Sequence, residues 1–117
     1  MQATITQTLT AELIQATAFR AADAYEQQHY PNGGWGACGF AWVNVALTTK
    51  GNTREGKAER KQLEALGFRK DYTGAYQLWN PAKYATQNVD TLEAGARAAA
   101  QLLKAAGYTA YAGSRLD

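Results

Sequence analysis

The stretch Phe40-Ala41-Trp42-Val43-Asn44-Val45-Ala46-Leu47 decides the fold class of this chain. Its residues are mostly β-branched, aromatic or otherwise apolar, and Gly51-Asn52 follows soon after, so the stretch is predicted to form a strand. Its nearly unbroken apolar character places that strand in the middle of a sheet. Side chains alternate along a strand, so one face is expected to carry Phe40, Trp42 and Asn44. The aliphatic Val43, Val45 and Leu47 are expected to face the helices.

Patterns on either side of this strand predict three helices and three further strands. The helices are expected at residues 9–28, 53–66 and 91–106, and the strands at 68–72, 75–79 and 108–112. Thr10 and Thr53 are typical helix N-caps, and Asp90 with Glu93 resembles a capping box. A two-residue turn at Thr73-Gly74 is expected to join the second and third strands.

The interior of these helices is also predicted from their spacing. In helix 53–66, Ala58, Leu63 and Leu66 are expected to face inward. Helix 91–106 contains many small residues, Gly95 and Ala96 among them, which indicates close approach to a neighbour. The last strand is expected to end at residue 112, directly before Gly113-Ser114-Arg115-Leu116-Asp117.

The order of elements is a helix followed by β-α-β-β-α-β, which predicts an α+β fold. We expect a ferredoxin-like split β-α-β antiparallel sheet (βαββαβ) with an additional N-terminal helix. Residues 1–117 are expected to form a single domain, with the N-terminal helix in residues 1–30 and the βαββαβ core in residues 40–117. In this plan the core helices cover one sheet face. The N-terminal helix either covers the other face, the interpretation we favour, or leaves the aromatic face around Trp42 open to stack nucleobases.

Composition excludes several classes of protein. The chain has 117 residues, of which 46% are hydrophobic and 19% charged, as in ordinary globular domains. No apolar run approaches the roughly 18 residues of a membrane helix. Met1-Gln2-Ala3-Thr4 lacks the features of a signal peptide, so an intracellular protein is expected. One cysteine and one histidine supply neither an internal disulfide nor a zinc site, and no cofactor motif is present.

The net charge of +2 is small, but its distribution is uneven. Residues 50–71 contain seven basic and four acidic residues, a surplus of three. The basic residues are Lys50, Arg54, Lys57, Arg60, Lys61, Arg69 and Lys70. Because acidic residues are interspersed, this segment is more typical of a solvated helix face than of a nucleic-acid track, which stays the alternative.

Residues 33–39 contain four glycines and allow three interpretations. A phosphate loop is rejected because the glycines precede a strand and no Gly-Lys-Ser/Thr follows. A Cys38 nucleophile with His29 as its base is the second, although in papain-like proteases the cysteine opens a helix and the histidine lies downstream. The third, which we favour, is a loop whose glycines permit close backbone approach to the sheet or to a ligand. The residues predicted to line a ligand site are Trp35, Cys38, Gly39, Trp42, Asn88, Tyr111 and Arg115.

Several runs of the sequence carry a resemblance to known proteins. They are Gly36-Ala37-Cys38-Gly39-Phe40-Ala41-Trp42-Val43, Lys50-Gly51-Asn52-Thr53, Leu66-Gly67-Phe68-Arg69-Lys70, Leu78-Trp79-Asn80-Pro81, Gln87-Asn88-Val89-Asp90 and Tyr111-Ala112-Gly113-Ser114-Arg115-Leu116-Asp117. Over roughly residues 35–117 the chain resembles a family of small uncharacterised tailed-bacteriophage proteins. The resemblance implies a location in the cytoplasm of the infected bacterial host and carries over no catalytic residue.

These observations favour a small non-enzymatic phage accessory protein. It is expected to bind a host or phage macromolecule, nucleic acid among them, or an anionic ligand such as a nucleotide, without a cofactor. Two alternatives remain at this point: a Cys38-dependent hydrolase or transferase, and a minor structural protein of the virion.

Overall fold

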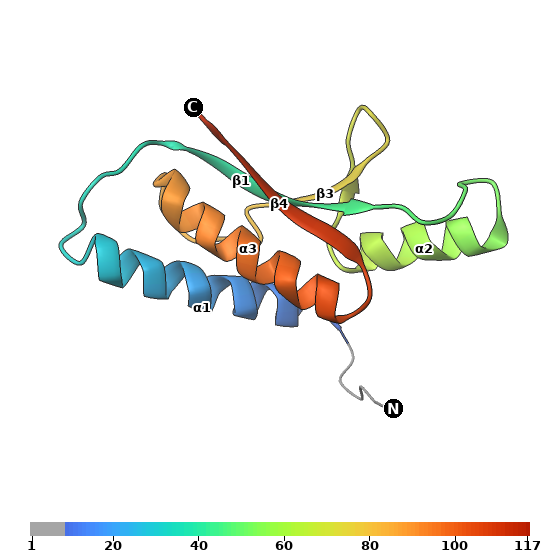
Figure 1. Cartoon of the computed structure of the whole chain (residues 1–117), viewed down its shortest axis with the longest axis horizontal. Coiled ribbons are helices and arrows are strands. Elements are labelled where there is room, and N and C mark those ends of the chain that lie inside the picture. The colour runs from blue at the N-terminus through green and yellow to red at the C-terminus, as the bar shows by residue number, and fades with distance from the viewer. Residues whose placement is uncertain (1–8) are drawn as a thin grey trace.

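The computed structural model describes residues 9–117, so the segment considered for a signal peptide lies outside it. The elements are α1 (Ala11–His29), β1 (Gly39–Ala46), α2 (Arg54–Ala65), β2 (Arg69–Lys70), β3 (Tyr76–Trp79), α3 (Val89–Ala105) and β4 (Thr109–Leu116) (Figure 1). All seven elements lie where the sequence predicts them, with shifted ends. The local signals explain this agreement: the hydroxyl oxygen of Thr10 accepts from the Leu13 N–H at 3.0 Å, and that of Thr53 accepts from the Gly56 N–H at 2.9 Å.

The four strands form one antiparallel sheet in the order β2-β3-β1-β4. β1 and β3 are therefore the inner strands, as expected from the apolar character of residues 40–47. Trp42 lies opposite Trp79 on β3 and opposite Gly113 on β4. The chain is thus an α+β protein with three helices and a four-stranded antiparallel sheet.

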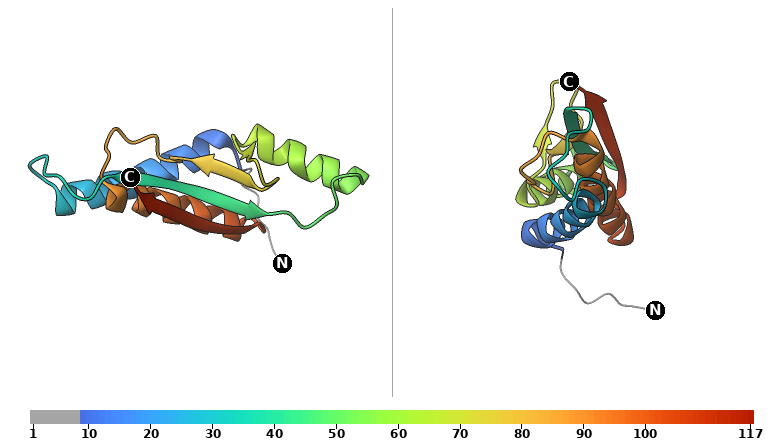
Figure 2. Two further views of the ribbon diagram at one scale, coloured as in Figure 1. Left: turned by 90° about the horizontal axis from the view of Figure 1, so that it is seen from above. Right: turned by 90° about the vertical axis from the view of Figure 1, so that its left-hand side faces the viewer.

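The three helices lie on the same side of the sheet (Figures 1 and 2). α3 packs beneath β1 and β4, and α1 packs against α3. The expectation that the N-terminal helix covers the other sheet face is therefore wrong. The reason is the small size of the residues where the helices meet: a Cβ added to Gly95 would lie 3.1 Å from the carbonyl oxygen of Ala18. Only this close approach buries Ile14, Ala18 and Ala22 of α1 completely.

Polar contacts join α1 to α3, and one of them involves Asp90, the residue expected to cap α3. Asp90 does not cap α3, because the helix begins at Val89 with Asn88 at its N-cap position. Instead the Asp90 carboxylate accepts a hydrogen bond of 3.2 Å from the hydroxyl of Tyr30, just after α1. Partial burial and this carboxylate raise the pKa of Tyr30, so the phenol stays a donor.

α2 extends past one end of the sheet, beside the β2–β3 hairpin (Figure 2). Leu63 and Leu66 at its C-terminal end are buried. Ala58, expected to face inward, is exposed. The prediction from helical spacing fails at Ala58 because no part of the sheet lies opposite the first half of α2.

The two strand ends that differ most from expectation are set by pairing partners. β2 has only two residues, and the Asp71 N–H donates to the Ala75 carbonyl at 2.8 Å. The turn therefore contains three residues, with Gly74 at a φ of 92°, rather than two. β4 continues to Leu116 rather than ending at 112, because Gly39 to Ala41 of β1 supply partners for Ser114 to Leu116.

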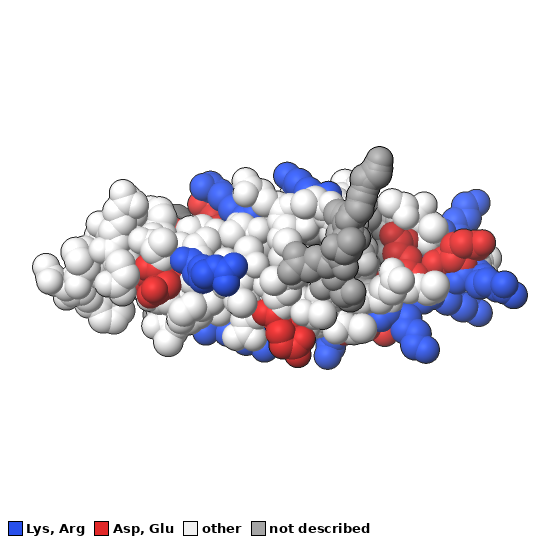
Figure 3. Space-filling model, turned by 90° about the horizontal axis from the view of Figure 1, so that it is seen from below, with Lys and Arg blue, Asp and Glu red and all other residues white. Residues whose placement is uncertain are grey.

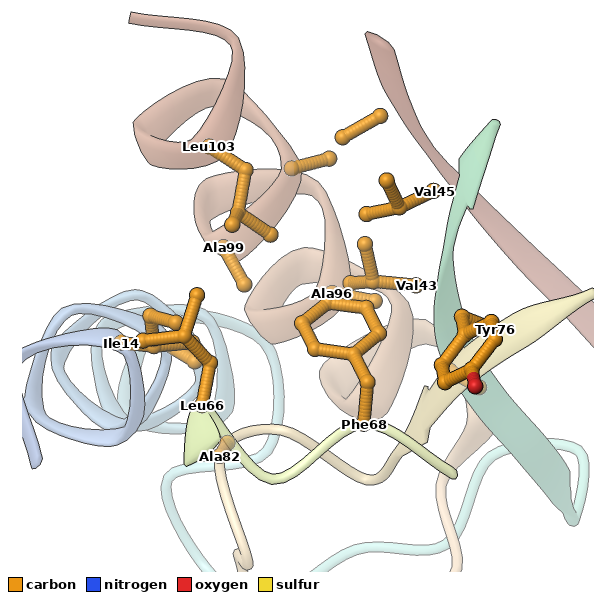
Figure 4. Packing of buried hydrophobic residues seen from close by; sticks show 14 of the residues in the cluster. Ile14, Val43, Val45, Leu66, Phe68, Tyr76, Ala82, Ala96, Ala99 and Leu103 are labelled. Atoms are coloured by element: carbon orange, nitrogen blue, oxygen red, sulfur yellow. The ribbon is translucent and has the colours of Figure 1, made fainter. Parts of the chain in front are cut away.

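The core lies between the sheet and the helices. Val43 and Val45 of β1 point into it, as predicted from the alternation along the strand. Phe68, which directly precedes β2, lies among residues of α1, α3 and the sheet in Figure 4 and is fully buried. This phenylalanine therefore joins the hairpin to the helical layer.

Glu59 of α2 fixes the loop that follows β1. Its carboxylate accepts hydrogen bonds from the backbone and the hydroxyls of Thr48 and Thr49, among them 2.9 Å from the Thr48 hydroxyl. Partial burial opposes the charged form, but the hydrogen bonds from Thr49 and Thr48 outweigh it and lower the pKa of Glu59.

Substitution Glu59→Gln is expected to lower the free energy of unfolding by about 1 kcal/mol at neutral pH, since a charge-assisted set of hydrogen bonds is weakened. Because the folded pKa is lowered, this stabilisation is complete above the ordinary pKa of glutamate and is lost as the pH falls through the lowered value. Urea unfolding from pH 7 to pH 3 measures it. The matched Glu55→Gln, in the first turn of the same helix, is expected to cost less than about 0.5 kcal/mol. Equal effects of the two substitutions would contradict this role.

Candidate functional site

The side of the sheet opposite the helices is an open face with a distinctive composition. On the three longer strands β1, β3 and β4, strand alternation and the register place ten side-chain positions on it. They are Phe40, Trp42, Asn44 and Ala46 of β1, Gln77 and Trp79 of β3, and Thr109, Tyr111, Gly113 and Arg115 of β4. No element of residues 9–117 covers this side in Figures 1 and 2. We call these ten positions the open face.

Three aromatic rings form a cluster at one end of the open face. The ring centroids of Trp42 and Trp79 are 5.0 Å apart at an interplanar angle of 34°. Phe40 meets Trp79 edge-on, with centroids 6.1 Å apart. Phe40 and Trp79 keep 40% and 48% of their surface exposed. Aromatic side chains usually bury such surface, so this exposed cluster is a candidate contact site for another molecule.

Gly113 of β4 determines how Trp42 lies. A Cβ added to Gly113 would be 2.6 Å from Nε1 and 2.7 Å from Cε2 of the Trp42 indole. The indole therefore lies directly across the β4 backbone, in a space that only glycine leaves free. The side chain of Trp79 then packs beside it, so Gly113 supports the whole cluster.

Arg115 and Tyr111 extend the open face along β4. The Arg115 guanidinium carbon lies 5.5 Å from the centroid of the Phe40 ring, a cation–π arrangement. Tyr111 lies opposite Asn44 and is 53% exposed. Arg115 is the one charged residue among the ten positions, so the face is aromatic and weakly positive.

This arrangement suits planar, electron-rich or anionic ligands. Flat exposed rings stack on other flat rings, and a guanidinium beside them binds phosphate or carboxylate oxygens with two parallel hydrogen bonds. The Trp79 Nε1–H already donates to Gln77 at 3.1 Å, which leaves the ring plane rather than its polar edge for a partner.

The structure brings together three of the predicted ligand residues, Trp42, Tyr111 and Arg115, on the open face. Gly39 lies beneath its end, where a Cβ would collide with the Arg115 carbonyl and the Val89 side chain. The absence of a side chain at Gly39 therefore allows β1, β4 and α3 to lie close together at this point.

Asn88 and Trp35 lie apart from the open face. Asn88 is 2% exposed, and its Oδ1 accepts from the Gly36 N–H at 2.8 Å while its Nδ2 donates to Glu26 and Gly34 at 3.4 Å. These bonds hold the glycine-rich loop to α1 and α3. Trp35, 82% exposed, lines a shallow hollow of about 550 Å³ beside them.

Cys38 and His29, the nucleophile and base of the alternative interpretation, contact different neighbours. Cys38 is half-buried just before β1, where its carbonyl accepts from the Asp117 N–H at 3.0 Å, and it lines a hollow of about 190 Å³ with Phe40 and Trp79. It starts no helix. The His29 ring stacks on Tyr25 at the end of α1, with centroids 4.1 Å apart.

Of the basic residues of segment 50–70, Arg69 lies opposite Gln77 and so on the same side of the sheet as the open face, but these residues form no continuous track along it. The Arg60 guanidinium donates to the carbonyls of Gly56 and Thr49, and that of Arg69 donates to the carbonyl of Phe68 at 2.9 Å. Arg69 is exposed, as are Lys50, Arg54, Lys57, Lys61 and Lys70. Figure 3 shows Lys and Arg intermixed with Asp and Glu at the end of the molecule that α2 forms. This mixture is typical of a solvated helix surface.

Two residues of the site, Phe40 and Trp79, were missing from the predicted ligand residues. Phe40 had a usable signal, since alternation puts it on the same face as Trp42. Aromatic residues of the third strand are expected on this face too, but the place of Trp79 directly beside Trp42 depends on the register between β1 and β3.

Comparisons of the chain with protein-family models, with curated proteins and with solved structures found no match. Within residues 9–117, no cluster of three or more His, Cys, Asp or Glu side chains is suited to hold a metal ion. The helices that the structure describes are too short or too polar to cross a membrane.

Proposed function

We propose that this protein binds single-stranded nucleic acid on the open face. The observation that carries the proposal is the composition of that face: four aromatic rings beside one arginine, with no acidic side chain and no aliphatic side chain larger than alanine among its ten positions. Aromatic residues and arginine are also enriched in protein–protein interfaces, but several exposed flat rings beside a guanidinium are the arrangement on which bases stack and a phosphate binds.

Each part of the open face has a role in this proposal. Bases stack on the exposed rings of Phe40, Trp79 and Tyr111, and Arg115 binds a phosphate between them. The amides of Asn44 and Gln77 offer hydrogen bonds to base edges. A duplex keeps its base planes stacked on each other, so a platform of this kind selects unpaired strands.

Fluorescence anisotropy with labelled eight-nucleotide strands tests the proposal. Oligo-dT, oligo-U and a duplex of the same length are titrated at 50 mM and 200 mM salt. We expect both single strands to bind at low salt, at least tenfold more tightly than the duplex. Failure of every single strand to bind at 50 mM salt, or equal affinity for the duplex, would overturn the proposal. Oligo-dU is titrated as well, because it differs from oligo-U only in the sugar, and the ratio between these two affinities identifies the preferred sugar.

Substitution Arg115→Gln is expected to weaken single-strand binding and to flatten its salt dependence. Loss of one phosphate contact on a single strand reduces the slope of log affinity against log salt by about 0.7. Arg97→Gln is the matched control, because Arg97 lies on α3 and pairs with Glu93 at 3.0 Å. An unchanged slope for Arg115→Gln would remove Arg115 from the phosphate contact.

We also propose a ferredoxin-like classification and a place in phage infection. The strand order and directions support the ferredoxin-like plan, while the position of α2 past the end of the sheet departs from it. The resemblance to tailed-phage proteins supports an accessory role in the cytoplasm of the infected bacterium. Mass spectrometry of purified virions separates that role from a structural one.

A further inference from the structure

The outer edge of β4 is the longest unpaired strand edge in the described part of the chain. β4 has eight residues and pairs with β1 on one side only, at the end of the sheet. Figures 1 and 2 show no helix, strand or loop of residues 9–117 along its other side. Such an edge presents a row of backbone donors and acceptors to another strand.

The hydrogen-bond pattern identifies which backbone groups point outward. The Asp117 N–H donates to the Cys38 carbonyl, and Gly39 lies opposite Leu116. In an antiparallel pair the bonded positions alternate, so the odd-numbered residues of β4 bond to β1. The N–H and C=O groups of Ala110, Ala112, Ser114 and Leu116 therefore face outward.

The other edge of the sheet has the features that block strand addition. β2 consists of Arg69 and Lys70 alone, and short, charged edge strands discourage pairing. β4 has neither device: it contains no lysine, no proline, and one charged residue, Arg115. The two edges thus differ in the property that controls pairing with another chain.

We propose that β4 pairs with β4 of a second copy of this chain, antiparallel about a two-fold axis at Gly113. The choice of a second copy rests on self-complementarity, since Tyr111 and Arg115 stand two positions on either side of Gly113. Pairing about that residue puts Arg115 of each copy against the exposed ring of the partner's Tyr111, which forms two cation–π pairs. The amide groups of Ala112 bond to those of the partner's Ser114. The product is one sheet of eight strands.

Analytical ultracentrifugation of the full chain without nucleic acid tests this pairing. The mass is expected to rise with concentration from 12.7 kDa towards twice that value. Tyr111→Lys, which opposes two arginines across the axis, is expected to raise the dimer dissociation constant about tenfold or more. The double variant Tyr111→Lys/Arg115→Glu restores opposite charges and is expected to recover the dimer. Tyr72→Lys, at a fully exposed tyrosine in the β2–β3 turn, is the matched control and leaves the dimer unchanged.

A monomer at all concentrations, a dimer indifferent to Tyr111→Lys, or a double variant that stays monomeric would each overturn the proposal. Circular dichroism verifies that every variant is folded. Amide hydrogen exchange gives a second measurement: exchange at Ala112 and Ser114 slows as concentration rises, and unchanged exchange there also counts against it. Both measurements omit nucleic acid, so their outcome is independent of the proposed function.

Discussion

Replacement of Phe68 by alanine is expected to lower the free energy of unfolding by about 3–5 kcal/mol. The ring is fully buried, and Figure 4 places it among Leu66, Val43, Tyr76 and Ala96. These neighbours come from four separate segments held by the sheet and the helices, so they cannot move together to fill the cavity. A typical domain of this size is stable by about 5–15 kcal/mol, so much of the fold's stability is at stake. Urea unfolding followed by far-ultraviolet circular dichroism measures the loss.

Two further variants make this prediction specific. Phe68→Leu keeps part of the volume and is expected to cost less than half as much. Tyr72→Ala, a few residues on, removes a fully exposed ring and is expected to change stability by less than about 0.5 kcal/mol. If Phe68→Ala matched Tyr72→Ala, the ring would not organise the core as the packing indicates.

Replacement of Trp79 by alanine is expected to lower the affinity for single strands by about 5- to 150-fold. Stacking of a base on an aromatic side chain contributes about 1–3 kcal/mol, and Trp79 contacts both other rings of the cluster. Trp35→Ala is the matched control, since Trp35 is 82% exposed but lies in the loop before β1. Equal losses for the two tryptophans would place the binding surface elsewhere.

Gly113→Ala tests the same cluster without removing any ring. Its new methyl group collides with the Trp42 indole and must displace it, because the β4 backbone cannot move away from β1. Affinity is expected to fall at least fivefold while the unfolding transition remains cooperative. Anisotropy titrations and urea unfolding of the same preparation separate the two effects.

Elements governed by local chemistry were predicted well from the sequence. Thr10 and Thr53 cap their helices through neighbouring residues, and the alternation of residues 40–47 fixed which side chains face the core. The position of α1 was not predictable in this way, because an apolar stripe indicates burial without naming its partner. The small residues around Gly95 did indicate a close neighbour for α3, and α1 is that neighbour.

Only part of the candidate site could be predicted from the sequence. Trp42, Tyr111 and Arg115 were identified, but their meeting depends on the register between strands far apart in sequence. Arg115 reaches Phe40 only because β4 runs on to Leu116, and that length is set by β1 rather than by residues 113–116 themselves. Asp90 shows the converse: a local capping signal was overridden by the hydroxyls of Tyr25 and Tyr30 on a distant segment.

The packing of α1 on α3 has a consequence for how the molecule can be divided. The β-α-β-β-α-β part looks like an autonomous module with a helix added in front, but its second helix is lined with alanine and glycine on the side that α1 occupies. Without α1, that side of α3 would lose its contacts with Ile14, Ala18 and Ala22, and its alanine and glycine surface would be exposed to water. α1 is therefore part of the cooperatively folded unit. A truncation at residue 30 would remove part of the hydrophobic core of that unit.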